Sequence, residues 1–294
     1  MSLVINHNLM AMNAARNLGV SYGNLETSTR RLSSGLRITQ ASDDAAGLAV
    51  RELMRADVSS LQQGIRNAND AISLIQTADG ALGVIDEKLI RMKELAMQAA
   101  TGTYNSDQRL IIDSEYQAMA SEITRIANST DFNGIYLLNG ALSGSHDGSP
   151  LKATGKLKVH FGTGNDSSED YYYIEINSAT ASSLGVGLAA GSGAGASIST
   201  QELAQQSLDV LNKAIISKDK IRANLGALQN RLENTVTVLE IQAENVQAAE
   251  SRISDVDVAS EMTEFVRNQI LTQSAVSMLA QANSMPRMAL SLIG

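Results

Sequence analysis

The chain has 294 residues, of which 44% are apolar, and its 3 Phe, 7 Tyr and no Trp leave too few aromatic side chains to fill a thick core. Its apolar mass comes from Ala, Leu, Ile, Val and 11 Met, which suits packing of helix against helix. The formal charge of -8 argues against general nucleic-acid binding, and the absence of cysteine excludes disulfides, iron–sulfur clusters and thiolate metal sites.

The N-terminal end is amphipathic and carries no Lys, Arg, Asp or Glu in residues 1–15. Chain ends are normally frayed and solvated, so an apolar end predicts a partner. Residues 1–37 have a local excess of arginine, which we interpret as a solvated face rather than a nucleic-acid site. We expect no secretory signal, because no basic region precedes an apolar one, and no membrane insertion, because no run of 18 apolar residues occurs.

Ser42, Asp43 and Asp44 predict the start of a long helix, because they combine capping side chains with negative charge. The two carboxylates fit a cap better than acid–base catalysis, since adjacent helical residues point about 100° apart. The apolar residues that follow keep a four-three spacing with one phase adjustment, which predicts a coiled-coil seam. The seam consists of Ile65, Ala68, Ile72, Ile75, Ala78, Leu82, Ile85, Leu89, Met92, Ala96 and Ala99. A helix of about 50 residues is roughly 75 Å long.

Two further elements precede the middle of the chain. Asn105 and Ser106 can cap a third helix over about residues 107–128. The stretch 131–140 then contains two Asn-Gly pairs, which favour tight primed turns.

The middle of the chain predicts a β-hairpin between irregular segments, residues 141–155 and 178–199. Apolar and polar residues alternate in two short runs, which predicts strands joined by a turn at residues 162–170. The inward positions are Leu157, Val159, Phe161, Tyr172, Ile174 and Ile176. We interpret the cluster Gly191, Gly193 and Gly195 as a flexible linker, because no strand precedes it and no Lys-Ser/Thr follows it to form a phosphate loop.

Ser199 and Glu202 fit a capping box that opens another long helix, which reaches Ile253. A four-three stripe held over more than four heptads again predicts a coiled-coil seam. The stripe consists of Ile221, Leu225, Leu228, Leu232, Thr235, Leu239, Gln242, Val246, Ala249 and Ile253.

The C-terminal end, residues 271–294, contains no acid and a single base, Arg287. Its four-three spacing indicates a coiled-coil seam, a simpler interpretation than a Met-rich peptide groove. The seam consists of Leu271, Ala275, Met278, Ala282, Met285, Ala289 and Leu292. Because Ala and Met dominate it and Pro286 interrupts it, we expect both chain ends to be disordered in the monomer and to order on assembly.

The sequence contains no constellation that indicates chemistry. His7, His146 and His160 lie in unrelated segments without metal-ligand spacing, and no nucleophile is paired with a base. We therefore expect neither an enzyme nor a cofactor. The elements together predict a mainly α fold: a long antiparallel helical rod or coiled coil built from both termini, with a small β-hairpin region in the middle.

Three segments together closely resemble bacterial flagellin: RLSSGLRITQASDDAAGLAV at Arg31–Val50, INHN at Ile5–Asn8 and QANSMPRMALSLIG at Gln281–Gly294. The first is the most specific of the three. The resemblance covers roughly residues 1–140 and 200–294.

The resemblance implies a filament subunit with three regions. Residues 1–43 and 255–294 would form a coiled-coil layer lining the filament core. Residues 44–140 and 200–254 would form a rod-like helical domain, and residues 141–199 would complete it with a hairpin and surface loops, without a large outer domain. The self-assembly positions on the terminal helices would be Ile5, Leu9, Leu18, Leu25, Leu32, Leu36, Leu271, Met278, Met285 and Leu292.

The resemblance also implies export of the unfolded chain through the flagellum's own secretion channel, and thus a secreted protein of the extracellular flagellum. The implied partners are further copies of this chain, an export chaperone, the filament cap and the hook–filament junction proteins. An animal Toll-like receptor for flagellin is a further implied partner, since Arg91, Leu95 and Glu115 match the motif positions that it recognises. Arg91 and Leu95 lie four residues apart and off the seam, so we expect an exposed patch that also serves as a subunit contact.

Two other classes of protein are compatible with the helical pattern. A hook–filament junction protein would have similar ends, but it would be a trace component of sheared surface protein. A coiled-coil scaffold or adhesin with no flagellar role predicts a stable dimer with ordered ends, whereas protease trimming of both ends from a soluble monomer favours flagellin.

Overall fold

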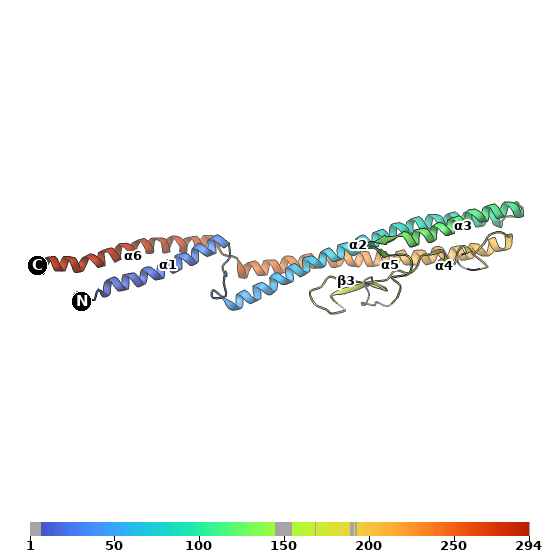
Figure 1. The fold of residues 1–294 in the computed structure, drawn as a ribbon. Coiled ribbons are helices and arrows are strands. Elements are labelled where there is room, and N and C mark those ends of the chain that lie inside the picture. The colour runs from blue at the N-terminus through green and yellow to red at the C-terminus, as the bar shows by residue number, and fades with distance from the viewer. Residues whose placement is uncertain (1–6, 145–154, 168, 189–190, 192, 294) are drawn as a thin grey trace. The chain divides into compact units, whose positions relative to one another are not determined.

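The computed structural model describes residues 7–144, 155–167, 169–188, 191 and 193–293 (Figure 1). Long helices come from both ends of the chain and short antiparallel strands lie between them, which confirms the predicted fold class. The elements are α1 Leu9–Ser34, α2 Ala45–Ala100, α3 Ser106–Ser129, β1 Asp131–Phe132, β2 Ile135–Tyr136, β3 Leu157–His160, β4 Tyr171–Ile174, α4 Ala181–Leu184, α5 Gln201–Ser254 and α6 Val258–Ile293.

The chain packs as two compact units, residues 1–58 with 244–294 and residues 59–243. The long helices α2 and α5 contribute residues to both units. The division expected from the sequence, at residues 43/44 and 254/255, follows the breaks between helices. The packing instead changes within the helices, because a continuous helix can exchange neighbours without a break in its backbone.

Side-chain caps begin two of the predicted helices. The Asn105 side chain accepts a hydrogen bond from the Gln108 backbone N–H at 2.8 Å, and the Gln108 side chain accepts one from the Asn105 N–H at 3.1 Å, so α3 opens with a capping box. At the start of α2, the Asp44 carboxylate accepts from the Gly47 N–H at 2.9 Å. The predicted roles of Asn105 and Asp44 are confirmed.

The capping box predicted from Ser199 and Glu202 is wrong. Helix α5 begins at Gln201, and the Thr200 hydroxyl accepts from the Leu203 N–H at 3.3 Å. Ser199 lies one residue too early, because its own N–H donates to the Ser197 hydroxyl in a local turn. Two adjacent hydroxyl residues both fit a cap in sequence, and tertiary contacts choose between them.

The core of residues 59–243 runs along the predicted seam of α2. From Ala68 to Ala99, nearly every seam position is buried. Residues from α3, α5 and the β3–β4 hairpin pack against it in one hydrophobic cluster. The α5 stripe is buried at Ile221, Leu225, Leu232 and Leu239. It fails at Gln242, which is exposed while its neighbour Ala243 is buried.

Two ion pairs join α2 to α5 and fix their antiparallel register. The Arg222 guanidinium donates to both carboxylate oxygens of Asp79, at 2.7 and 3.1 Å. The Lys218 ammonium lies 2.6 Å from Asp86 and 2.7 Å from Asp219, and its side chain is only 2% exposed. A buried lysine is unfavourable unless it is paired, so these partners hold its position along the seam.

The ion pair between Asp79 and Arg222 predicts a specific pH dependence of the stability of the fold. Its hydrogen bond, supported by its charge, lowers the pKa of Asp79. A lowered folded-state pKa adds stability above the ordinary carboxylate pKa, and this stability is lost as the pH falls through the lowered value. We expect Asp79→Asn to cost less than about 1 kcal/mol at neutral pH, because the pair is partly exposed.

The measurement is thermal unfolding of the full chain between neutral pH and about pH 2, within which carboxylates titrate. The stability of the Asp79→Asn variant should fall less steeply as the pH is lowered than that of the unchanged chain. Asp70→Asn, at an exposed position of the same helix, is the matched control. An equally steep loss of stability at low pH in the Asp79→Asn variant and the unchanged chain would contradict this role of the Asp79–Arg222 pair.

The middle of the chain contains the predicted β3–β4 hairpin and one of the two predicted Asn-Gly turns between paired strands. Asn133 (φ 53°) and Gly134 (φ 77°) form the tight turn between β1 and β2, as one predicted Asn-Gly pair requires. No strand pair flanks the second, at Gly140, within the described residues. Strands β3 and β4 pair as predicted, with Leu157 opposite Ile174. Their predicted inward positions Val159, Phe161, Ile174 and Ile176 are buried.

The segment after β4 is more ordered than the predicted linker. It contains α4, and Ala181, Leu184, Val186 and Ile198 are buried. Gly195, with φ 87°, turns the chain back so that its carbonyl accepts from the buried Tyr116 hydroxyl at 2.7 Å. The flexible-linker interpretation is wrong for Gly195: its glycine-specific φ serves a packed turn.

Candidate assembly surface

Helices α1 and α6 lie side by side and run antiparallel (Figure 1). The Asn8 side chain at the start of α1 meets Ala282 near the end of α6, and Arg31 near the end of α1 lies 3.6 Å from Glu261 at the start of α6. The two charge-poor chain ends therefore fold against each other. The row of α1 that is buried or half-buried consists of Ala11, Ala14, Leu18, Ser21, Leu25, Ser28 and Leu32.

Three predicted positions on α1 lie on this row: Leu18, Leu25 and Leu32 are each half-buried. Leu36 is also half-buried and forms an antiparallel bridge with Asp255. Leu9 is 64% exposed, so it does not join the contact with α6. Ile5 lies outside the described residues.

The seam predicted on α6 is displaced in phase from the face that contacts α1, apart from Ala275 and Ala282, which lie on both. Leu271 is 48% exposed and Met278 is 63% exposed, and Met285 is half-buried. Leu292 lies in α6, but its side chain is outside the described part. The buried or half-buried row that faces α1 consists of Phe265, Asn268, Thr272, Ala275, Leu279 and Ala282.

The cause of this displacement is that α6 carries apolar residues all round. A four-three spacing can then be drawn in more than one phase, and only a helix with one apolar stripe has a unique contact face. The face of α6 that contacts α1 combines Phe265 and Leu279 with small and polar side chains, including the buried Asn268 and Thr272. The Thr272 hydroxyl donates to the Asn268 carbonyl at 2.7 Å, which satisfies it within its own helix.

Most of the larger apolar side chains of both helices consequently face outward. We call this set the assembly surface: Met10, Met12, Val20, Tyr22, Val258, Met262, Val266, Ile270, Leu271, Val276, Met278 and Met288, each at least 44% exposed. Exposed apolar surface on this scale marks an interaction site rather than ordinary solvent-facing residues.

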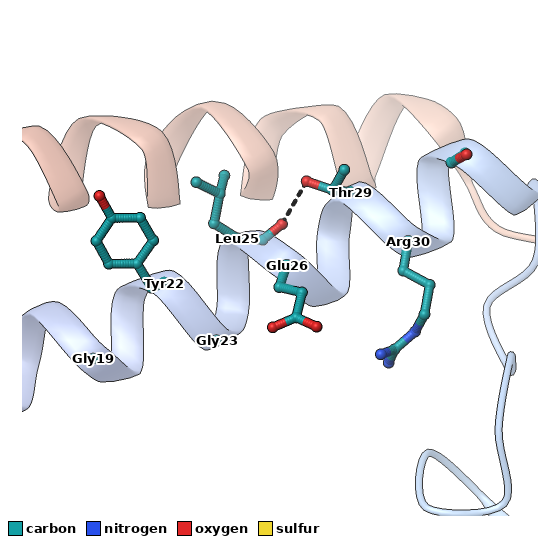
Figure 2. Close-up of a pocket in the computed structure, with 8 residues that line it drawn as sticks. Gly19, Tyr22, Gly23, Leu25, Glu26, Thr29 and Arg30 are labelled. Atoms are coloured by element: carbon teal, nitrogen blue, oxygen red, sulfur yellow. Dashed lines mark hydrogen bonds between the residues drawn. The ribbon is translucent and has the colours of Figure 1, made fainter.

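An open groove of about 800 Å³ runs along α1 beside this surface (Figure 2). Gly19 and Gly23 lie in it, and a Cβ added at either would meet nothing within 4 Å. Glu26 and Arg30 turn away from α6 in this view. The two glycines let another backbone approach α1 closely, which suits a helix of a neighbouring subunit.

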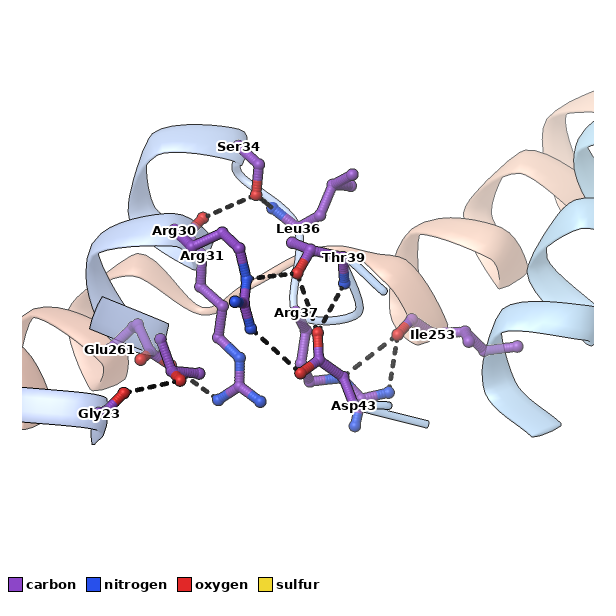
Figure 3. A network of polar contacts seen from close by, with 11 residues as sticks. Gly23, Arg30, Arg31, Ser34, Leu36, Arg37, Thr39, Asp43, Ile253 and Glu261 are labelled. Carbon is purple, nitrogen blue, oxygen red and sulfur yellow. Dashed lines mark hydrogen bonds and ion pairs between the residues drawn. The ribbon is translucent and has the colours of Figure 1, made fainter. Parts of the chain in front are cut away.

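The loop between α1 and α2 is closed by polar contacts (Figure 3). Arg30 donates to the Thr39 hydroxyl at 2.8 Å and pairs with Asp43 at 3.2 Å. Asp43 also accepts from the backbone N–H groups of Thr39 and Gln40 at 3.1 and 3.2 Å. These hydrogen bonds, that of the Thr39 N–H foremost, lower the pKa of Asp43. Asp43 therefore organises the loop, while Asp44 caps the helix.

The same loop is tied to the α5–α6 connection. Arg37 donates two side-chain hydrogen bonds to the Ile253 carbonyl, at 2.7 and 3.2 Å, and its backbone N–H donates to the Ser254 carbonyl at 2.7 Å. Gly35, with φ 73°, ends α1 in the left-handed conformation that permits this turn. The segment Arg31–Val50 singled out in the sequence therefore encodes a closed joint rather than a ligand site.

The three candidate receptor positions differ in their exposure to solvent. Arg91 on α2 pairs with Glu115 on α3 at 2.8 Å and with Glu94 at 3.0 Å, and the Arg91 and Glu115 side chains are 48% and 44% exposed. Leu95 is 1% exposed, so the expectation that it is exposed is wrong. Helix α2 is covered on two sides, by α3 and α5, and this buries a second row of residues beside the predicted seam.

The described residues show neither a metal centre nor a membrane span. No three His, Asp or Glu side chains among them converge on a possible ion site. No helix within the described ranges is long and apolar enough to cross a bilayer. The exposed apolar surface of α1 and α6 is a helical pairing surface, and it places the chain in the class of self-assembling structural proteins.

Comparison with known proteins identifies the family. The model of the bacterial flagellin N-terminal helical region matches residues 5–143, and that of the C-terminal helical region matches residues 208–293. The chain is 40% identical over 291 residues to the flagellin of Halalkalibacterium halodurans, covering 99% of this chain and 100% of that protein. It is 41% identical over 291 residues to the flagellar filament 33 kDa core protein of Treponema phagedenis, with the same coverage.

One solved structure shows the shared fold. A Vibrio parahaemolyticus protein described as flagellar hook-associated aligns with a TM-score of 0.55 and 15% identity, covering 72% of this chain and 100% of that one. The chain belongs to the bacterial flagellin family, whose members are structural subunits of the flagellar filament.

Proposed function

We propose that this chain is exported unfolded through the flagellar secretion channel and polymerises outside the cell into the helical filament used for motility. The observation that carries the proposal is the assembly surface on a helix pair that leaves most of its large apolar side chains exposed. A surface whose partner lies on another copy of the same chain makes head-to-tail contacts, and these propagate as an open helical assembly.

The proposed arrangement follows the regions expected from the sequence. Residues 1–43 and 255–294 would line the filament core, residues 44–140 and 200–254 would form the rod, and residues 141–199 would complete the rod. Burial of apolar surface, at about 25 cal/mol per Å², drives growth and is offset in part by ordering of the chain ends.

Electron microscopy of the purified protein under polymerising conditions tests this proposal. We expect uniform thin filaments, because residues 141–199 are too few to form a large outer domain. A chain that forms a discrete stable dimer with protease-resistant ends would instead support a non-flagellar scaffold.

Before assembly, the same surface needs protection from aggregation. We infer that an export chaperone covers the apolar faces of the terminal helices in the cell, and that the filament cap and hook–filament junction proteins contact these faces in the flagellum. The identity of 40% with flagellins over nearly the whole chain favours the filament subunit over the junction protein. Its dominance in sheared surface protein would decide between the two.

We also propose that an animal Toll-like receptor for flagellin binds the patch formed by Arg91 and Glu115. The two side chains are exposed, come from different helices and are held in one place by their ion pair. Leu95 is buried beneath them and acts in this proposal through packing, not through direct contact.

A receptor reporter assay with soluble variants tests this patch. We expect Arg91→Ala and Glu115→Ala each to reduce signalling by about tenfold, which corresponds to loss of one charged contact at an interface. Arg125→Ala removes a comparable exposed pair with Glu122 on α3 and serves as the control. Unchanged signalling in both patch variants would count against receptor binding at this position.

A further inference from the structure

Pro286 lies inside α6 and leaves one backbone acceptor of that helix without its usual donor. In an α-helix the N–H of each residue donates to the carbonyl four residues earlier, and proline has no N–H. The carbonyl affected here is that of Ala282, a buried residue on the row that faces α1. An unpaired carbonyl in such a position is unfavourable, because water reaches it poorly.

The side-chain amide of Asn8 supplies the missing donor. Its Nδ2 donates to the Ala282 carbonyl at 2.7 Å. Its Oδ1 accepts from the Ala11 backbone N–H at 3.0 Å and thereby caps α1. One amide therefore satisfies a free acceptor of α6 and a free donor of α1.

Away from the joint between Arg37 and the Ile253 carbonyl, the rest of the α1–α6 contact specifies its alignment only weakly. Its α1 row combines the evenly spaced Leu18, Leu25 and Leu32 with the evenly spaced Ser21 and Ser28, so the rows fit one another after a shift by whole turns along the helix axis as well as before it. The unpaired carbonyl differs from every other position, because Pro286 is the only proline in α6.

We propose that Asn8 and Pro286 together set the register of the terminal helix pair. Asn8 is a positioning residue: it selects the alignment in which its amide reaches the carbonyl that Pro286 leaves free. This inference rests on the proposed function, because both of its measurements are made on filaments.

The first test is a double-mutant cycle on the full chain. Asn8→Asp keeps the capping oxygen, since aspartate caps helices as well as asparagine does, but it removes the donor to Ala282. Pro286→Ala restores a backbone N–H that can donate to the same carbonyl. We expect Asn8→Asp alone to raise the concentration needed for filament growth about tenfold, and to raise it less than about twofold in the Pro286→Ala background.

The second test measures register directly. The chain contains no cysteine, so spin labels attached at Asn13→Cys on α1 and Gln281→Cys on α6, both exposed positions, report a single distance. Labelled subunits are diluted with unlabelled ones in the filament. We expect one narrow distance in the unchanged chain. Asn8→Asp and Pro286→Ala should each broaden it by steps of about 5 Å, one helical turn.

Two outcomes would overturn the proposal. If Asn8→Asp weakens growth equally in both backgrounds, Asn8 acts only as a cap. If the label distance stays narrow in Asn8→Asp and Pro286→Ala, other contacts set the register. Failure of the unchanged chain to form filaments would contradict the proposed function instead.

Discussion

Deletion of residues 271–294 is expected to leave a soluble helical protein that cannot polymerise. The deletion removes the second half of α6, including the contact of Ala282 with Asn8 and the outward-facing Leu271 and Met278. The part of α1 that packs against the deleted residues loses its partner. The assembly surface loses its C-terminal part. Residues 59–243 keep their whole core, because no residue of that core comes from the deleted segment.

Sedimentation and electron microscopy check this result. The truncated chain should stay in the supernatant at concentrations at which the full chain sediments, and it should not extend filament seeds made from the full chain. Circular dichroism should still show a highly helical protein. Filaments of normal length from the truncated chain would overturn the assembly mechanism.

The ordering of the chain ends can be measured on the same samples. Amide hydrogen exchange should be fast in both ends of the full-length monomer and slow in the filament, because most residues of the α1–α6 contact are only half-buried. Slow exchange in the isolated monomer would show that the ends fold without neighbouring subunits.

Gly64→Ala is expected to destabilise residues 59–243 by about 2–3 kcal/mol, a typical cost of overpacking a tight contact. A Cβ at Gly64 would overlap the carbonyl oxygen of Phe161 and would lie 2.8 Å from its carbonyl carbon. These are backbone atoms of the hairpin segment, which the Asn67 side chain also fixes by donating to the His160 carbonyl at 2.8 Å. The added methyl group must therefore push the hairpin away from α2.

Gly80→Ala on the same helix is the matched control. A Cβ there would meet nothing within 4 Å, so the change should be neutral or stabilising by up to about 1 kcal/mol through helix propensity. Thermal or denaturant unfolding of the full-length monomer gives both values. Equal stability of the two variants would show that the hairpin does not pack on α2 through Gly64.

Local patterns were sufficient to predict the elements that one apolar stripe or one turn defines. The α2 seam was predictable because its buried positions repeat along a helix with a polar outer face. The β3–β4 hairpin was predictable because its alternation has a period of two, and a wrong register would expose Val159 and Ile174. The Asn105 cap was predictable from its own side chain and that of Gln108.

Contacts between distant segments were not predictable in the same way. The contact face of α6 could not be chosen from its sequence, because apolar residues surround the helix. The burial of Leu95 depends on a second covering helix, and the role of Thr200 depends on the turn before it. The bond between Asn8 and Ala282 joins residues 274 positions apart, and no local signal indicates it.

The ion pairs between α2 and α5 also limit how the chain can misfold. The pairs are seven residues apart on α2, at Asp79 and Asp86, but only four apart on α5, at Arg222 and Lys218. If α5 slid by one heptad in the direction that brings Arg222 toward Asp86, the apolar seam would still interlock, but Lys218 would face Lys93. Two ammonium groups would then oppose each other where one is buried. This repulsion would destabilise a mispaired intermediate and so favour the native register of α2 and α5.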